Sequence, residues 1–396
     1  METGQAPANS TPARNGPLLI FLLLLTPILV AKHIALESAT NRWDFQAFYL
    51  GAEMVSHGEG SRLYDFDRQA AAQMRYVDPT RQVTLPDLPF LYPAAITLLF
   101  FPFTRFPMVA AYALWTAINL LMLVATLRLL QKVLPLPQDN RPLLAAVLFS
   151  PVYFCLLKGQ VSLLILLIVA LGFYFLLRSR PLLAGFALGL ATLKFQVVLG
   201  LLAVLALRRM WRVLAGSAIG ASVVAGLSVL ITGWHAAAQY PTYLRQVAYH
   251  ERVSYTPVNV NLRGMLWQLL RHEPAVWLVA LLSVALLILA TVAWNDIATG
   301  FSIAVTLSLL TSYHAHYEEL SLLLLPLAVL MPRVRWNRAL IGIAGLVVVV
   351  GYITLFSGLH TLFSVLCYGL VIFGLWRTRP TMEGKITAER DVMAVT

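Results

Sequence analysis

The chain has 396 residues, of which 59% are hydrophobic and 12% are charged. A soluble protein carries roughly 25% charged residues, so this composition excludes a soluble globular fold. The formal net charge of +11 does not indicate nucleic-acid binding, because Lys and Arg fall in short clusters between apolar runs, as orientation signals do. Cys155 and Cys367 both lie inside apolar runs, so the sequence offers neither a disulfide framework nor a Cys-rich metal site.

Apolar runs of about 20 residues, the length that spans a bilayer as a helix, recur along the chain. They predict an all-α polytopic membrane protein with roughly 11 to 13 transmembrane or re-entrant helices. We divide the chain into a disordered cytoplasmic tail (1–16), one membrane domain (17–379) and a second cytoplasmic tail (380–396). The first span is expected at 18–35, where Arg14 favours an inside N-terminus, and a cleaved signal peptide is the competing interpretation.

Residues 37–92 carry too many charges and turns to lie in lipid, so they predict a first outer loop. Within it, 45–56 and 66–76 have the apolar spacing of helices that lie along an interface. Asp65-Phe66-Asp67 matches the Asp-x-Asp of metal-dependent nucleotide-sugar enzymes, but its position at a turn favours a helix N-cap. The apolar piece 93–103 is too short to span and predicts a re-entrant or broken helix.

Further spans are expected at 107–130, 141–157, 161–177, 213–231, 275–294, 297–312, 320–331, 339–356 and 359–376. The pieces 182–193 and 195–207 predict a hairpin of short helices with Lys194 near the outer side, or one long span with a buried lysine. Residues 233–273 predict a second polar outer loop. With this topology the basic clusters fall inside, so both termini are cytoplasmic.

Two small-residue patterns predict close helix contacts: Gly185-x-x-x-Gly189 and Gly216-x-x-x-Gly220. No Walker loop, dinucleotide fingerprint or Ser-His-Asp arrangement stands in a suitable strand-turn-helix context. The sequence therefore does not point to a water-soluble nucleotide as a donor.

The predicted topology brings three separate segments to the outer face: the first loop with Asp44, the second loop, and the turn 311–319. Ionisable groups at membrane depth are costly and are therefore candidates for function. If the turn is helical, His314 and Glu318 stack four residues apart while His316 points away. Three interpretations of these residues are open: they bind a metal, they form hydrogen bonds to a sugar or phosphate, or they form a polar helix end. Metal binding is the weakest of these interpretations, because further ligands are not supplied nearby.

Asp44 stands among the aromatic residues Trp43, Phe45 and Phe48. Partial desolvation there raises the pKa of the carboxyl and strengthens it as a proton acceptor. A helix N-cap, or a pairing with Arg42, is the structural alternative.

Three arginines of the second outer loop lie among tyrosines, namely Arg245, Arg252 and Arg263. An arginine fork suits phosphate recognition, and tyrosine is enriched at membrane interfaces. The segment therefore predicts either phosphate contacts or a plain aromatic belt with solvated charges.

Several short motifs in order along the chain resemble those of glycosyltransferase family 87. They are Asp44-Phe45-x-x-Phe48-Tyr49, Gly60-x-x-Leu63-Tyr64-Asp65, Phe90-x-Tyr92-Pro93, Gly159-Gln160-x-Ser162, Gly185 to Lys194, Asn259-x-x-Leu262-Arg263-Gly264, and His314 with Tyr317. The family comprises membrane enzymes of the GT-C type that take a sugar from a polyprenyl phosphate, including a mannosyltransferase that elongates phosphatidylinositol mannosides. The chain departs from the family pattern at Tyr313, Phe195 and Ala94, where proline is common, and at Glu318, where aspartate is common. These departures leave the sugar and the acceptor open.

The resemblance implies a GT-C fold and an inverting transfer of a hexose, with mannose favoured, from a polyprenyl phosphate to a lipid or glycan hydroxyl. The reaction would take place on the outer face of the inner (plasma) membrane, without a metal or other cofactor and without nucleic acid. Asp44 would be the general base that deprotonates the acceptor. The implied substrate contacts are His314, His316, Glu318, Tyr49, Tyr92 and Gln160, and the implied phosphate contacts are Arg263, Arg252 and Lys194.

Two other functions use the same kind of lipid-linked substrate. A transporter or flippase of lipid-linked saccharides is expected to have paired repeat halves with matching broken helices, and the sequence shows no obvious repeat. A polymerase or ligase would share the lipid donor but move a longer chain.

Overall fold

The computed structural model describes residues 44–75, 88–254, 256–334, 338–357 and 359–378. The predicted first span, both predicted tails, Arg42 and Trp43 lie outside these ranges. The described residues are helical almost throughout and contain no strand. The prediction of an all-α polytopic membrane protein is confirmed.

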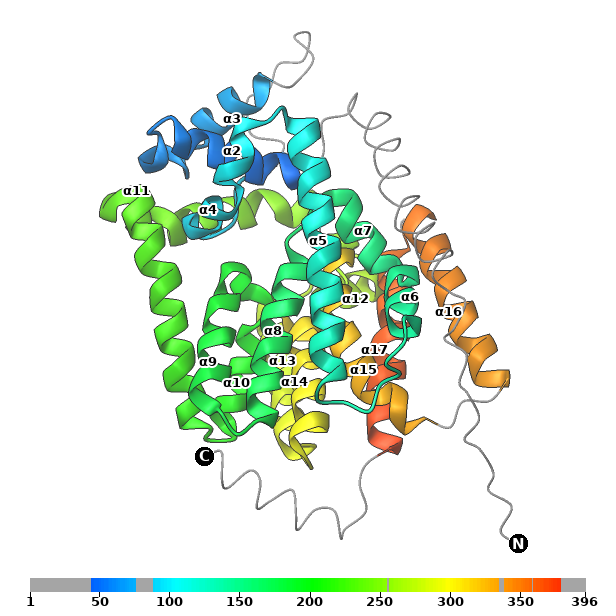
Figure 1. The fold of residues 1–396 in the computed structure, drawn as a ribbon. Coiled ribbons are helices and arrows are strands. Elements are labelled where there is room, and N and C mark those ends of the chain that lie inside the picture. The colour runs from blue at the N-terminus through cyan, green and yellow to red at the C-terminus, as the bar shows by residue number, and fades with distance from the viewer. Residues whose placement is uncertain (1–43, 76–87, 255, 335–337, 358, 379–396) are drawn as a thin grey trace, which may run out of the picture.

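Most predicted apolar runs form helices close to the expected bounds (Figure 1). The α-helices are α2 (Asp44–Ser56), α3 (Phe66–Met74), α4 (Thr97–Phe100), α5 (Met108–Gln131), α6 (Arg141–Leu148), α7 (Ser150–Lys158), α8 (Ser162–Leu177), α9 (Pro181–Leu190), α10 (Leu199–Leu207), α11 (Trp211–Ser254), α12 (Leu262–Leu270), α13 (Val276–Val292), α14 (Ile297–Thr311), α15 (Leu324–Leu330), α16 (Arg338–Ser357) and α17 (His360–Arg377). Short 3-10 helices connect them: η1 (Gly60–Arg62), η2 (Ala94–Ile96), η3 (Phe101–Arg105), η4 (Ala191–Val197), η5 (Thr256–Val258), η6 (Tyr317–Leu323) and η7 (Met331–Arg333).

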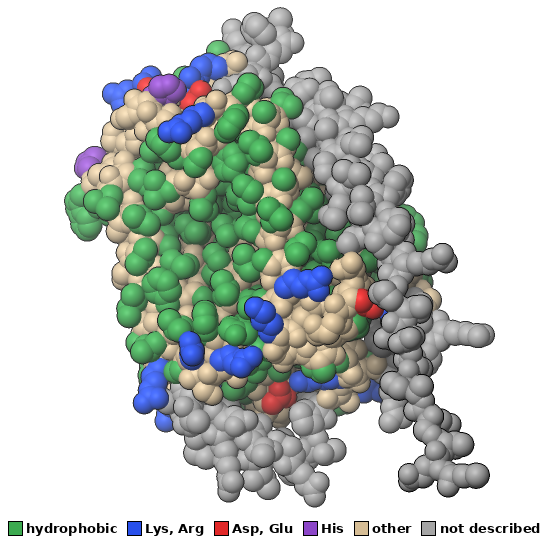
Figure 2. Space-filling view, viewed as in Figure 1, with side chains coloured by type: hydrophobic (Ala, Val, Ile, Leu, Met, Phe, Trp, Pro, Cys, Tyr) green, Lys and Arg blue, Asp and Glu red, His purple; other side chains and the backbone are tan. Residues whose placement is uncertain are grey.

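The exterior of the molecule is that of a membrane protein. Within the described ranges, α5, α11 and α17 are long and apolar enough to cross a membrane, and the bent pair α6–α7 counts as a fourth candidate. The described residues also include shorter apolar helices of 10 to 17 residues, among them α8, α13 and α14. On the face shown in Figure 2, apolar side chains cover the middle, while Lys and Arg side chains gather toward the upper and lower edges.

The segments expected to be irregular are more helical than the sequence suggests. α11 continues through Ser254, so the predicted second outer loop begins as a helix. A break at Gly233, whose φ is +77°, turns the helix, and its second half crosses the molecule at the level of α4 in Figure 1. The predicted span 141–157 is likewise divided into α6 and α7, which meet at 67°. Pro151 lies in the first turn of α7, where its missing N–H is tolerated.

The first-loop helices form as predicted, but α2 does not lie along the surface. Its apolar side chains, including Phe45, Phe48 and Leu50, are buried on several sides of the helix. Phe48 stacks on Phe100 with ring centroids 4.8 Å apart. Asp65 caps α3 as predicted, because its side chain accepts hydrogen bonds from the backbone N–H groups of the residues two and three positions on.

Tyrosines of the second loop pack against the first loop instead of facing lipid as a belt. The ring of Tyr240 lies 4.6 Å from that of Tyr64, and its hydroxyl donates to the carbonyl oxygen of Leu91 at 2.7 Å. The hydroxyl of Tyr243 lies within hydrogen-bond distance of the Gln69 side chain. The first loop and the second half of α11 therefore form one layer above the membrane helices.

The two small-residue patterns join α9 to α11, as predicted. A Cβ atom on Gly185 would overlap the carbonyl oxygen of Val213, and one on Gly216 would overlap that of Leu182. The two backbones approach closely because neither glycine carries a side chain.

We expect Gly185→Ala to destabilise the protein. Overpacking costs about 1–3 kcal/mol, which outweighs the gain of about 1 kcal/mol that Ala brings within a helix. Thermal unfolding in detergent measures the effect. The matched control is Gly226→Ala in α11, where an added Cβ would meet nothing within 4 Å and the unfolding temperature should hold or rise. Equal shifts for the two variants would contradict this account.

Candidate active site

The site is built on the junction between α7 and α8, where the sequence reads Gly159-Gln160-Val161-Ser162. Gly159 ends α7 in the left-handed conformation with φ +62°, and its carbonyl oxygen accepts a hydrogen bond from the Trp115 indole at 2.9 Å. A Cβ atom here would lie 2.6 Å from the Cβ of Phe45. The absence of a side chain therefore lets the first turn of α2 rest on this junction.

Asp44 is the first residue of α2 and is partly buried. Its Oδ2 accepts a hydrogen bond of 2.8 Å from the Nε2 of Gln160. Burial raises the pKa of Asp44, while the charges of Lys158 and Lys194 and the hydrogen bond from Gln160 oppose this rise. The position at a helix N-terminus also favours the carboxylate form. Asp44 is thus a partly buried carboxyl group with a raised pKa, whose Oδ2 is directed at Gln160.

The amide of Gln160 connects Asp44 to the rest of the site. Its Oε1 accepts hydrogen bonds from the Tyr92 hydroxyl at 3.1 Å and from the Lys194 ammonium at 3.2 Å. The ring of Tyr92 packs on Phe48 of α2, with centroids 4.6 Å apart. Gln160 is 5% exposed, so these polar contacts are made away from bulk water.

Lys194 lies in the turn between α9 and α10. Its backbone leaves the helical region there, so the two pieces form short helices around a turn, as the hairpin interpretation predicts, yet the lysine side chain is buried at 2% exposure. The ammonium forms an ion pair with Glu319 and donates to the Ser162 hydroxyl at 3.2 Å.

Glu319 is the residue that sequence reasoning missed, because its neighbour Glu318 was chosen instead. Glu319 is 3% exposed, and its Oε2 accepts a 2.6 Å hydrogen bond from the backbone N–H of His316. His316 and Glu319 form a capping box at the start of η6. The spacing of a capping residue followed three positions later by Glu was the available sequence signal.

The turn 311–319 is not helical around the histidines, so the predicted stacking of His314 on Glu318 is wrong. The backbone before η6 is extended at His316, and the rings of His314 and His316 lie 4.2 Å apart. Burial lowers the pKa of His314 well below its usual value and that of His316 to about 3. Both imidazoles are therefore neutral at physiological pH and suited to hydrogen bonding.

Glu318 is buried at 2% exposure beside the same turn. Burial raises its pKa, and the nearby carboxylates of Glu319 and Asp44 raise it further. Among the residues that the structure describes, no group of three or more His, Cys, Asp or Glu side chains has the arrangement of a metal site.

Arg263 lies near the start of α12, on the other side of this turn. Its Nε donates to Glu273 at 2.6 Å, and the guanidinium lies over the Tyr313 ring, 4.6 Å from the centroid. The side chain is 6% exposed, and its Nη2 has no hydrogen-bond partner among the described residues. A buried guanidinium nitrogen whose two N–H donors have no acceptor among the described residues is suited to an anionic oxygen.

The segment before α12 is hydrogen-bonded to the turn 311–319 through two asparagine side chains. The Asn259 side chain accepts from the backbone N–H of Ala315 at 3.1 Å, and Asn261 donates to the Ser312 carbonyl at 2.8 Å. Asn261 also caps α12 by accepting from the N–H of Gly264, where a Cβ atom would overlap the Asn259 carbonyl. The motif Asn259 to Gly264 therefore sets the position of Arg263.

The sequence-predicted residues divide into two groups. Asp44, Gln160, Tyr92 and Lys194 are connected by hydrogen bonds, whereas His314, His316, Glu318 and Arg263 lie along the neighbouring turn and α12. Tyr49 faces another side of α2, where its hydroxyl donates to the Phe106 carbonyl at 2.9 Å. The side chain of Arg252 lies outside the described residues, and Arg245 is exposed on α11.

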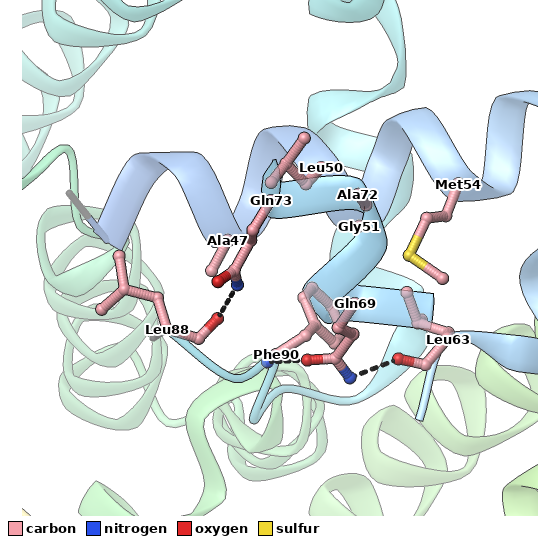
Figure 3. A pocket seen from close by; sticks show the side chains of 10 residues that line it. All are labelled: Ala47, Leu50, Gly51, Met54, Leu63, Gln69, Ala72, Gln73, Leu88 and Phe90. Carbon is pink, nitrogen blue, oxygen red and sulfur yellow. Dashed lines mark hydrogen bonds between the residues drawn. The ribbon is translucent and has the colours of Figure 1, made fainter. Parts of the chain in front are cut away.

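A small pocket between α2 and α3 is separate from this polar network (Figure 3). Among the described residues, no ionisable side chain lines it. Its two glutamine side chains form hydrogen bonds to backbone carbonyl groups: Gln69 donates to that of Leu63 and Gln73 to that of Leu88, each at 2.7 Å. This pocket is therefore interpreted as part of the packing of the first loop.

Fold and site together define a helical membrane protein with a buried polar network beside a carboxylate at a helix N-terminus. The chain belongs to glycosyltransferase family 87, whose family model matches residues 90–326. The match includes Gln160, Lys194, Arg263 and Glu319, while Asp44 precedes it. No curated protein and no solved structure matches the chain.

We expect Gly159→Ala to lower the unfolding temperature more than Gly58→Ala. Both glycines have positive φ, so both variants bear the backbone strain of about 1–2 kcal/mol that an L-residue meets there. Only at Gly159 does the added Cβ meet a neighbour, Phe45, since that of Gly58 meets nothing within 4 Å. Comparing the unfolding temperatures of the two variants measures the effect of this contact. Equal decreases in unfolding temperature would show that the contact has no effect on stability.

Proposed function

We propose that this glycosyltransferase moves a hexose, with mannose as the first candidate, from a polyprenyl phosphate to a lipid or glycan hydroxyl. Family membership supports the transfer of a sugar. A lipid-linked donor is supported by the apolar exterior, which can receive a polyprenyl chain between helices. The absence of a nucleotide-binding motif in the sequence agrees with this choice.

The single observation that carries the proposal is the Asp44 carboxylate, oriented by Gln160 at the N-terminus of α2. In the proposed reaction, Asp44 takes the proton of the acceptor hydroxyl as its oxygen bonds to the anomeric carbon. The bond from that carbon to the donor phosphate oxygen breaks, and its electron pair leaves with the polyprenyl phosphate. A single displacement of this kind inverts the anomeric carbon and balances without a metal or a second cofactor.

The departing phosphate carries negative charge that must be stabilised. Arg263 is the phosphate contact that we favour, because the Nη2 of its buried guanidinium has no hydrogen-bond partner in the part of the chain that the structure describes. Arg252 stays a prediction. The neutral imidazoles of His314 and His316 suit hydrogen bonds to sugar or acceptor hydroxyls, and Glu318 is a further candidate contact.

We further propose that the site faces the outer side of the plasma membrane, with both termini cytoplasmic. Basic residues concentrate at the ends of α8 and α10 and at the start of α11, opposite the Asp44 network, namely Arg178, Arg180, Arg208, Arg209 and Arg212. Cytoplasmic loops carry such an excess of Lys and Arg.

We expect Asp44→Asn to abolish transfer and leave the unfolding temperature near that of the wild type. A general base contributes about 10²- to 10⁴-fold to the rate, and an amide cannot accept the proton. The assay presents purified protein with a panel of polyprenyl phosphate sugars and a lipid extract. Asp65→Asn is the matched control, because asparagine caps a helix as well as aspartate does and transfer should be retained.

Three results of this assay would contradict the proposal. Wild-type transfer by Asp44→Asn would remove Asp44 as the base. Absence of any glycosidic product from every lipid donor would favour a transporter. Products that carry a preassembled chain in place of one sugar would favour a polymerase or ligase.

The rate should fall at acidic pH, because the base acts only when it is ionised. Burial raises the pKa of Asp44, so we expect the loss to begin above the ordinary aspartate value of about 3.9 as the pH decreases. Initial rates measured between about pH 4 and pH 8 give this acidic limb. Thermal unfolding at each pH separates it from denaturation. A rate that stays constant to pH 4 in folded protein would argue against a buried carboxylate base.

A further inference from the structure

The amide of Gln160 has only one orientation that its surroundings permit. Its Oε1 faces three donors, the Lys194 ammonium, the Tyr92 hydroxyl and the Val161 backbone N–H, and its Nε2 faces the Asp44 carboxylate. A flipped amide would place its NH₂ group against the ammonium, which has no acceptor, and its carbonyl oxygen against the carboxylate. The charges on either side therefore fix which end of Gln160 meets Asp44.

The ammonium that fixes Gln160 is itself fully engaged. An ammonium has three N–H donors, and Lys194 has three acceptors: Glu319, the Gln160 Oε1 and the Ser162 hydroxyl. Glu319 in turn accepts the His316 N–H through its second oxygen. With 2% exposure and every donor used, Lys194 is poorly placed to hold a donor phosphate.

We propose that Gln160 is the positioning residue of the base Asp44, and that Lys194 and Glu319 act through Gln160 and not on the donor phosphate. This inference rests on the proposed function. Gln160 donates to Oδ2 of Asp44, so that oxygen stays unprotonated and Oδ1 takes the acceptor proton. No proton passes through Gln160, which keeps the same hydrogen bonds before and after the transfer.

The geometry also predicts in which direction a substitution of Gln160 changes the pKa of Asp44. A hydrogen bond donated to a carboxylate favours its ionised form, so loss of the Gln160 amide raises the pKa of Asp44. The charged and titratable groups that face Asp44 are Lys158 from α7, Lys194 from η4, Glu318 and Glu319 from η6, and Tyr92. Because these stay in place in a Gln160 variant, the change reports on the amide itself.

The first test compares Gln160→Leu and Gln160→Glu with the wild type. Both should lower kcat by about 10- to 100-fold, the loss that a misplacement of about 1 Å produces. The acidic limb of the kcat profile should move to higher pH, by about one unit for Leu and further for Glu, which places a second carboxylate beside Asp44. The KM for the donor should stay unchanged. Gln239→Leu, an exposed glutamine of α11, is the substitution control.

The second test separates the two roles of Lys194. The double variant Lys194→Met, Glu319→Gln removes both charges together, so no buried ion is left unpaired. If Lys194 acts through Gln160, this variant lowers kcat and moves the acidic limb while the donor KM holds. A raised donor KM with an unmoved limb would make Lys194 a phosphate contact and overturn the inference.

Failure of this inference is distinguishable from failure of the proposed function. An inactive Asp44→Asn together with wild-type kcat and pH profile in Gln160→Leu would overturn only the positioning role. Full activity in Asp44→Asn would overturn the base itself.

Discussion

The ion pair between Lys194 and Glu319 is the interaction on which the site depends. Removing two charges from water costs several kcal/mol per ion, and their attraction repays this only where the remaining donors and acceptors are also satisfied. Here the ammonium also donates hydrogen bonds to Gln160 and Ser162, and Glu319 accepts one from the backbone N–H of His316. The pair thereby joins the α9–α10 turn, the α7–α8 junction and the start of η6, which are far apart in sequence.

Close backbone approach matters as much as charge in assembling these segments. Gly159 lets α2 reach the junction that carries Gln160, and Gly264 lets α12 close on Asn259. Each glycine stands beside a polar residue of the site in the same short motif. Both short motifs therefore combine a buried polar side chain with a glycine that permits the close approach.

The sequence predicts those features that depend on neighbouring residues. The bounds of α5, the cap at Asp65 and the α9–α11 contact follow from a long apolar run, a turn signal and a small-residue spacing. The capping-box spacing of His316 and Glu319 is also a local signal, but only packing against the distant Lys194 shows that Glu319 is the residue that forms the buried ion pair. The neighbouring histidine rings were missed for a related reason, since an extended backbone replaces the expected helical turn.

Gly233 has a consequence for how the molecule sits in a bilayer. From Trp211 to this break, α11 has about 22 residues and a length of about 33 Å, close to the hydrocarbon thickness of about 30 Å. Trp211 and Trp234 are both largely exposed, at 62% and 77%, one at each end of this stretch. Tryptophan concentrates at the two headgroup regions. The break at Gly233 thus ends a stretch of α11 of about bilayer length that has an exposed tryptophan at each end, and the helix continues beyond it in another direction.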